Sequence, residues 1–391
     1  MKKFLFFIFI CFTICLNGAQ IVRGPYTQDV EPTTAVIRFS TDEASPAWIE
    51  YGPKDNCSLI MTNSPRQRNH AINLHGLIPN TQFCYKVYVE NNKGTGVQAP
   101  QSGTFTTAYS AERKELSFLV LGNTADPNNN AGQIKKQLAQ SMINHKADFL
   151  IHTGNIATDG LLTNVYRDFF EPFKEVLKRT PYMAVLGQDE YGPNRDEAES
   201  KGFLNANYRV INTMPWSKGT PNYYYYDSAN ARIIVLDTNN VFGAVNAPTL
   251  DKDSPQYAWL KNALSTAGSD KWKIVVLHHP IYSSGASEDR LSQLLAPLFE
   301  TYRVNLVLQG HQGAYERTKP IRSGEASKTG PTYVTIGGAG RSFEPSSYSN
   351  EWSTKYYATP HFAHIKIVDR KLSLRIYTHE DKKIDALDIY F

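Results

Sequence analysis

The feature that most constrains the fold of this chain is a set of six short apolar runs that do not alternate with polar residues. Segments with helical spacing separate several of these runs, for example at 131–145 and 287–300. Strands without alternation are buried on both faces, so helices must cover them. The pattern therefore predicts an α/β domain of layered β-sheets flanked by helices. The runs lie at 117–121, 149–152, 182–186, 233–236, 274–277 and 304–308.

Short polar turns lie at the ends of five hydrophobic runs. Their sequences are Leu-Gly-Asn at 121–123, Thr-Gly-Asn at 153–155, Leu-Gly-Gln-Asp at 186–189, His-His-Pro at 278–280 and Gly-His-Gln-Gly at 310–313. Ligands of α/β sheets bind beyond the carboxyl ends of the strands. We therefore expect these turns to meet and to form the functional site.

The segment before this domain has a different rhythm. Short strand-like runs with a period of two, such as 35–40, 47–52 and 83–89, are separated by Pro-, Asn- and Gly-containing turns. About seven short strands in some ninety residues predict an all-β sandwich. We place this domain at 20–110 and the α/β domain at 114–391, and we expect the first to serve for spacing or shielding.

Residues 1–19 have the organisation of a cleaved signal peptide. Lys2 and Lys3 precede an apolar run from 4 to 16, which is too short to span a bilayer, and small residues follow it. No later segment reaches transmembrane length. The sequence predicts an exported protein without a transmembrane anchor, in the secreted, periplasmic or endomembrane-lumen class.

Net charge and cysteine content bear on the possible partners of the chain and on whether it forms a disulfide. A formal charge of +4 over 391 residues, without a basic stripe, argues against nucleic-acid binding. Cys57 and Cys84 remain after the signal peptide, and either a disulfide or two buried thiols fits their positions. Asn56 begins an Asn-Cys-Ser glycosylation sequon.

Several segments of the α/β domain resemble those of the calcineurin-like metallophosphoesterases. With the front domain, whose residues 76–85 resemble the turn into the sixth strand of a fibronectin type III domain, the chain is similar to the purple acid phosphatases. The resemblance implies two metal ions that share a bridging carboxylate and activate water to attack a phosphoester. It is carried by Asp-Phe-Leu-Ile-His-Thr-Gly at 148–154, Val-Leu-Asp-Thr at 235–238, Val-Val-Leu-His-His-Pro at 275–280, Ala-Tyr-Glu-Arg at 314–317 and the glycine turn at 332–340.

The same resemblance assigns seven metal-ligand positions and one proton donor. Only His278 and His311 keep the residue that the family uses there. An asparagine stands at the bridging position, and Asp189 stands where the family has a proton-donating histidine. The seven positions are Asn123, Asn155, Thr158, Gln188, His278, His311 and Gly313.

Two hypotheses follow. In the first, the chain has lost the two-metal chemistry, needs no cofactor, and is a binding or structural protein whose ligand carries phosphate or sugar groups. In the second, it is an active phosphoesterase with one divalent or trivalent ion, Fe, Zn or Mn, held by His278, His311 and Asp189. Other ligands for that ion would come from Asp126, Asp159, Glu190 and His279, although each of these also fits an ordinary turn, loop or core position.

Overall fold

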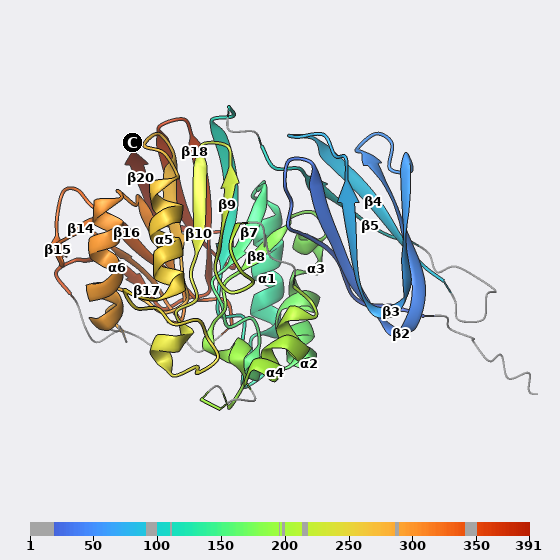
Figure 1. Ribbon diagram of the computed structural model, residues 1–391, viewed down its shortest axis with the longest axis horizontal. Helices are drawn as coiled ribbons and strands as arrows, with labels where there is room; N and C mark the ends of the chain where they lie inside the picture. Colours follow the sequence, from blue (N-terminus) through green and yellow to red (C-terminus); the bar gives the residue numbers. More distant parts are fainter. Residues whose placement is uncertain are drawn as a thin grey trace, which may run out of the picture.

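The computed structural model describes residues 19–90, 100–109, 112–194, 196–197, 200–212, 218–285, 289–340 and 350–391. Residues 1–18, and with them nearly all of the predicted signal peptide, lie outside the described residues. An antiparallel β domain and an α/β domain lie side by side (Figure 1). None of the helices within the described ranges is long and apolar enough to cross a membrane.

The N-terminal domain is a five-stranded antiparallel sheet in the order β1-β2-β4-β5, with β3 paired to β2. The predicted short strands at 35–40 and 47–52 are the two halves of one long strand, β2. Register shifts around Ser45 bend this strand, so that Ile37 and Ile49, from its two halves, enter the same core. The strands are β1 (Ile21–Gln28), β2 (Thr34–Pro53), β3 (Ile60–His75), β4 (Gln82–Val89) and β5 (Gln101–Thr106).

Cys57 and Cys84 form a disulfide, with their Cα atoms 5.2 Å apart. The bond ties the turn after β2 to β4. Disulfides form and persist in oxidising compartments, which agrees with an exported protein. Asn56 is exposed beside this bond, and its glycosylation stays a prediction.

The α/β domain contains two larger sheets. All six predicted apolar runs form strands: β6, β7 and β8 in one sheet, and β10, β11 and β12 in the other. The first sheet has the order β20-β19-β18-β6-β7-β8 and the second β17-β13-β16-β12-β11-β10-β9. Their strands are β6 (Glu115–Leu121), β7 (Phe149–His152), β8 (Tyr182–Ala184), β9 (Tyr224–Ser228), β10 (Ala231–Val235), β11 (Trp272–Val276), β12 (Leu306–Gln309), β13 (Tyr315–Thr318), β16 (Thr332–Ile336), β17 (Ser353–Tyr357), β18 (His361–Val368), β19 (Lys371–Thr378) and β20 (Lys383–Tyr390), with a small hairpin of β14 (Ile321–Arg322) and β15 (Glu325–Ala326).

The missing alternation in the apolar runs has a direct structural cause. In β10, Ile233 and Val235 face the core between the two sheets, whereas Ile234 faces the core beneath the helices α5 and α6. Both faces of this strand are thus covered. The helices are α1 (Gly132–Ile143), α2 (Leu162–Val165), α3 (Glu171–Leu177), α4 (Ser200–Leu204), α5 (Pro255–Ser265) and α6 (Asp289–Thr301), and single helical turns lie at Thr158–Gly160, Tyr166–Phe170, Gln188–Tyr191, Asn205–Arg209 and Asn239–Phe242.

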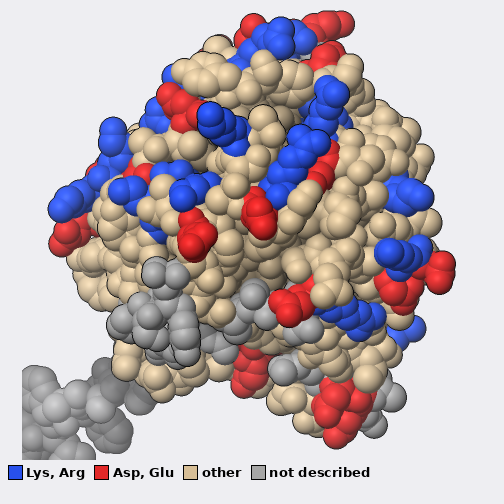
Figure 2. Space-filling model, turned by 90° about the vertical axis from the view of Figure 1, so that its left-hand side faces the viewer, with Lys and Arg blue, Asp and Glu red and all other residues tan. Residues whose placement is uncertain are grey.

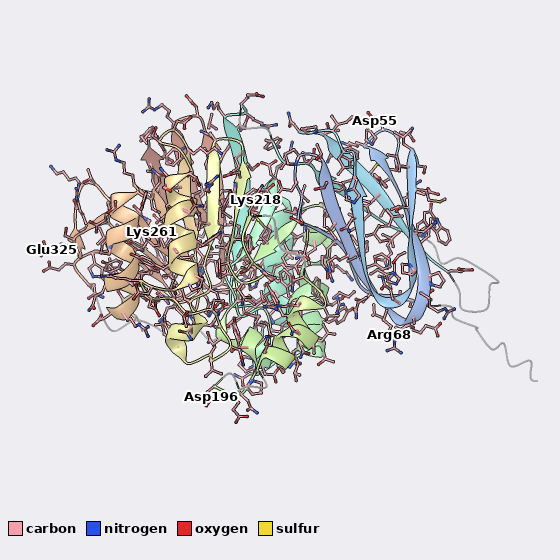
Figure 3. All side chains as sticks on the ribbon, viewed as in Figure 1. Asp55, Arg68, Asp196, Lys218, Lys261 and Glu325 are labelled. Atoms are coloured by element: carbon pink, nitrogen blue, oxygen red, sulfur yellow. A yellow bond between two sulfur atoms is a disulfide. The ribbon has the colours of Figure 1, made fainter. Side chains whose placement is uncertain are left out.

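The two domains share a packed and hydrogen-bonded boundary. Tyr26 of β1 belongs to the main hydrophobic core of the α/β domain, where its ring centroid lies 4.7 Å from that of Phe170. Its hydroxyl donates to the carbonyl of Ile211 at 2.6 Å. Lys218, labelled at the boundary in Figure 3, pairs with Glu31 of the β domain at 2.9 Å. The β domain is therefore attached through buried contacts.

Candidate functional site

Hydrogen bonds join the five predicted turns to one another beyond the strand ends. Asn123 Nδ2 donates to the carbonyl of His311 at 2.7 Å, and the amide of Asp189 donates to Asn155 Oδ1 at 3.1 Å. His278 contacts the turn after β7 through its ring, as described below. The prediction that these turns meet is confirmed for the described residues.

Backbone conformation explains which residues occupy the turns. Asn123, Asn155 and His311 have φ values of 54°, 53° and 64°, a left-handed region that asparagine tolerates better than most residues. At Gly187, a Cβ atom would lie 2.3 Å from Asn155 Oδ1. A glycine is needed there because the two turns approach so closely.

The hydrogen bonds fix the orientation of both asparagine amides. The backbone N–H of Asp189 needs an acceptor, so the atom of Asn155 that it contacts is the oxygen. Asn155 Nδ2 is then the other atom, and it has no hydrogen-bond partner among the described residues. In Asn123 the amino group donates to a carbonyl, which leaves Oδ1 unpartnered within the described chain. Both side chains are fully buried.

Three histidines gather at this site. His278, His279 and His311 each offer one ring nitrogen, and these atoms lie within 4.8 Å of one another. His278 Nδ1 donates to the carbonyl of Thr153 at 2.7 Å, so in the neutral ring Nε2 carries the lone pair. A ring nitrogen that donates to a carbonyl while the other carries a lone pair is the arrangement found in metal-binding histidines.

His279 is oriented by two residues that sequence reasoning did not single out for this role. Its Nδ1 lies 2.8 Å from Thr238 Oγ1, and its ring stacks on Phe242 with centroids 3.6 Å apart. Thr238 belongs to the Val-Leu-Asp-Thr segment that carried the family resemblance. Phe242 lies in a helical turn and gave no comparable signal.

The side-chain amide of Gln188 lies between two of the histidines. Its Oε1 is 2.8 Å from His278 Nε2 and 3.3 Å from His311 Nδ1. Neutral His278 has a lone pair on Nε2, so two acceptors would face each other there. The contact is satisfied when His278 is protonated or when the amide turns its amino group toward the ring.

The acidic residues proposed as alternative ligands have other contacts. Asp126 accepts from the backbone of Ala131 at 2.6 Å and lies 3.7 Å from the buried ammonium of Lys135. Asp159 accepts from Asn164 Nδ2 at 2.8 Å. Asp189 is half-buried and is not a member of the histidine cluster. It lines, with Asp159, a small cavity of about 170 Å³.

Glu190 is the buried carboxylate nearest to the asparagine turns. It is 2% exposed and accepts from the backbone amides of Asn155, Ile156 and Gly187 at 3.0, 2.8 and 2.7 Å. Burial raises the pKa of Glu190 to about 8, with a further contribution from Asp189, although the three amides act in the opposite direction. Glu190 therefore holds the turns together instead of facing the histidines.

The two remaining assigned positions contribute no metal-binding group of the expected kind. Thr158, at the tyrosine position, places its backbone N–H 3.0 Å and its Oγ1 3.3 Å from Asp168 Oδ2. Gly313 has no side chain. Of the seven assigned positions, His278, His311 and Gln188 are brought into contact with one another, and His279 joins the two histidines.

Comparison with known proteins identifies the family. Residues 118–315 match the calcineurin-like phosphoesterases over half of the chain. The chain belongs to this family. As a calcineurin-like phosphoesterase it is 23% identical to purple acid phosphatase 18 of Arabidopsis thaliana over 84% of the chain and 70% of the relative.

Solved structures show the same fold. A purple acid phosphatase from yellow lupin (Lupinus luteus) seeds superimposes with a TM-score of 0.76 at 18% identity, over 94% of this chain and 74% of that one. GAP50, described as the anchor in the inner membrane complex of Plasmodium, gives a TM-score of 0.55 at 22% identity, over 71% of this chain and 89% of GAP50. The predicted architecture, a β domain followed by a metallophosphoesterase domain, is thus confirmed.

Proposed function

We propose that this calcineurin-like phosphoesterase relative has lost two-metal hydrolysis and acts as an exported binding or structural protein. The orientation of Asn155 carries the proposal. At the position of the bridging carboxylate it presents an amino group, whose hydrogens repel a cation, because its oxygen is held by Asp189 N–H. Two cations a few ångströms apart repel by several kcal/mol at moderate dielectric, and a neutral amide does little to offset this.

The rest of the site supports the same conclusion. The candidate ligands that cluster within the described residues are three imidazoles without a carboxylate, and Gly313 supplies nothing. A site without carboxylates repels an anion less, so a phosphate- or sugar-containing ligand is the class we propose for it. The fold does not decide between roles, since it occurs both in a purple acid phosphatase and in a protein described as an anchor.

The histidine cluster favours one second candidate, a hydrolase with a single metal ion. His278, His279 and His311 would hold Fe, Zn or Mn. Such an ion would act as a Lewis acid on a phosphoryl oxygen. The chain's own contribution is orientation: Thr153 and Thr238 fix the rings of His278 and His279.

Metal analysis of the untagged protein, paired with an aryl-phosphate assay, separates the candidates. The proposal expects no stoichiometric Fe, Zn or Mn and no turnover. The single-metal candidate expects one ion per chain, lost in both His278→Ala and His279→Gln but kept in the exposed control His75→Ala. Two ions per chain, with turnover abolished by His278→Ala, would overturn both candidates.

A further inference from the structure

Two adjoining cavities lie at the opposite ends of the strands from the histidines. Lys273 is the second residue of β11, whereas His278 follows the end of that strand. The cavities have volumes of about 600 and 570 Å³ and share Arg303, Asn305 and Tyr390 in their walls. Each volume is in the range of small-molecule sites. The two cavities adjoin beside the end of α6, and together we call them the α6 groove.

A buried lysine stands in the wall of this groove. Lys273 is 6% exposed and forms no ion pair with any residue that the structure describes. Burial lowers the pKa of its ammonium group and the nearby charge of Arg303 lowers it further, whereas the carboxylate of Asp270 acts in the opposite direction. An isolated buried ammonium is destabilising unless an anion or hydrogen bonds compensate it. Its position on the cavity wall gives a ligand access to this charge.

Further cations line the groove without carboxylate partners. Arg303, Arg322 and Lys328 are exposed in its walls, and none forms an ion pair within the described ranges. Glu325, paired in register with Arg322 in the β14–β15 hairpin, forms no ion pair with it and does not line either cavity. The three side chains are therefore available to a bound anion.

The acidic side chains of the walls are already engaged. Asp388 lies 2.8 Å from Lys371 and 2.7 Å from Arg375, and Glu300 accepts from the backbone of Ser323 at 2.8 Å. Figure 2 shows the side of the molecule that lies at the left in Figure 1, where Lys and Arg side chains gather over the upper half of the face with Asp and Glu between them. Glu300 keeps its negative charge, but Lys273, Arg303, Arg322 and Lys328 outnumber it, so the net charge of these side chains is positive.

We propose that the α6 groove binds an oligomeric ligand carrying phosphate or sulfate groups, one group at Lys273 and Arg303 and another at Arg322 and Lys328. Charge-assisted hydrogen bonds from lysine and arginine to oxyanions are strong and directional. The shared wall at Arg303 lets one ligand span both cavities. This site is separate from the histidine cluster and does not depend on the proposed role of that cluster.

Calorimetric titration at low salt tests the site with two probes, tripolyphosphate and a trisulfated disaccharide. The wild-type protein binds at least one probe, and the tighter of the two identifies the source of the oxyanion. Lys273→Met, which keeps the apolar stem and removes the charge, weakens binding by at least about tenfold. Arg303→Gln, at an exposed position where folding is not at stake, does the same.

The matched control is Lys261→Met on α5, which removes an equal charge from the surface outside the groove. Figure 3 labels this side chain on the exposed face of the helix. Binding by the control within about twofold of wild type supports a specific site. Failure of both probes to bind the wild type, or an equal loss in Lys261→Met and Arg303→Gln, would overturn the proposal.

Discussion

Replacing Asn155 by aspartate restores the carboxylate that the family resemblance assigns to this position, and the structure predicts that it destabilises the protein. Asn155 is fully buried, and its backbone amide donates to Glu190 at 3.0 Å. The new carboxylate would replace an unpartnered amino group close to an existing buried acid. Burial disfavours the charged form of the new side chain and raises its pKa.

The size of the effect has an upper limit. A buried aspartate escapes the penalty of its charge by staying protonated in the folded state. Keeping the side chain protonated at pH 7, about 3 pH units above the ordinary pKa of aspartate, costs about 1.4 kcal/mol per unit, or about 4 kcal/mol of folding free energy. Because the folded-state pKa is raised, the loss appears as the pH rises above about 4, and it shrinks to below about 1 kcal/mol at pH 4.5.

Urea unfolding of the wild-type and Asn155→Asp proteins at pH 7 and pH 4.5, with a metal chelator present, measures the loss of stability at each pH. The exposed Asn262→Asp substitution on α5 is the matched control and should change stability by less than about 0.5 kcal/mol. An Asn155→Asp protein as stable as the wild type at pH 7 would refute the reasoning, because position 155 would then tolerate a negative charge without a metal ion.

Three further outcomes follow from other buried contacts. His152 accepts from Gly154 N–H through Nδ1 and contacts Thr124 Oγ1 through Nε2 at 3.0 Å, and burial lowers its pKa to about 3. Its contribution to stability is therefore present above about pH 6.5 and is lost as the pH falls toward 3. In His152→Gln, the slope of the unfolding free energy against pH, measured by urea titration, should be smaller by about 1.4 kcal/mol per pH unit in that window. Arg317→Met should lower stability by about 3 kcal/mol in the same assay, because it leaves the buried Asp385, which Arg317 contacts at 2.6 Å, without its cation, and adding Asp385→Asn should recover most of the loss. Gly187→Ala should destabilise by at least about 2 kcal/mol through its clash with Asn155, whereas Gly202→Ala, where a Cβ meets nothing within 4 Å in α4, should raise the thermal midpoint slightly; equal effects would contradict the close approach of the turns.

The sequence predicted those parts of the fold that depend on local hydrophobic pattern. The six apolar runs, their burial on both faces and the meeting of the turns all follow from residues such as Ile233 and Ile234, which face two different cores. The length of β2 did not follow, because two strand-like runs separated by polar residues look the same whether the chain turns or bends between them. The register shifts at Ser45 that decide this are set by pairing with β3.

The site could be predicted as a set of positions but not as a set of contacts. His279 was an alternative ligand alongside several acidic residues. Its place in the histidine cluster depends on Phe242 and Thr238, which approach it only in the folded chain. The Gln188 amide between His278 and His311 depends on a side-chain conformation that the sequence does not encode locally. The orientation of the Asn155 amide, which leaves its amino group without a partner among the described residues, likewise depends on a backbone amide from another turn.

The insertion of Tyr26 into the α/β core has a consequence for the history of the chain and for its engineering. An α/β domain separated from its partner would lose the ring that packs on Phe170 and would expose an apolar depression to water, where it favours aggregation. The two domains are therefore poor candidates for shuffling or transplantation as independent modules. We expect them to be inherited, expressed and degraded as one unit.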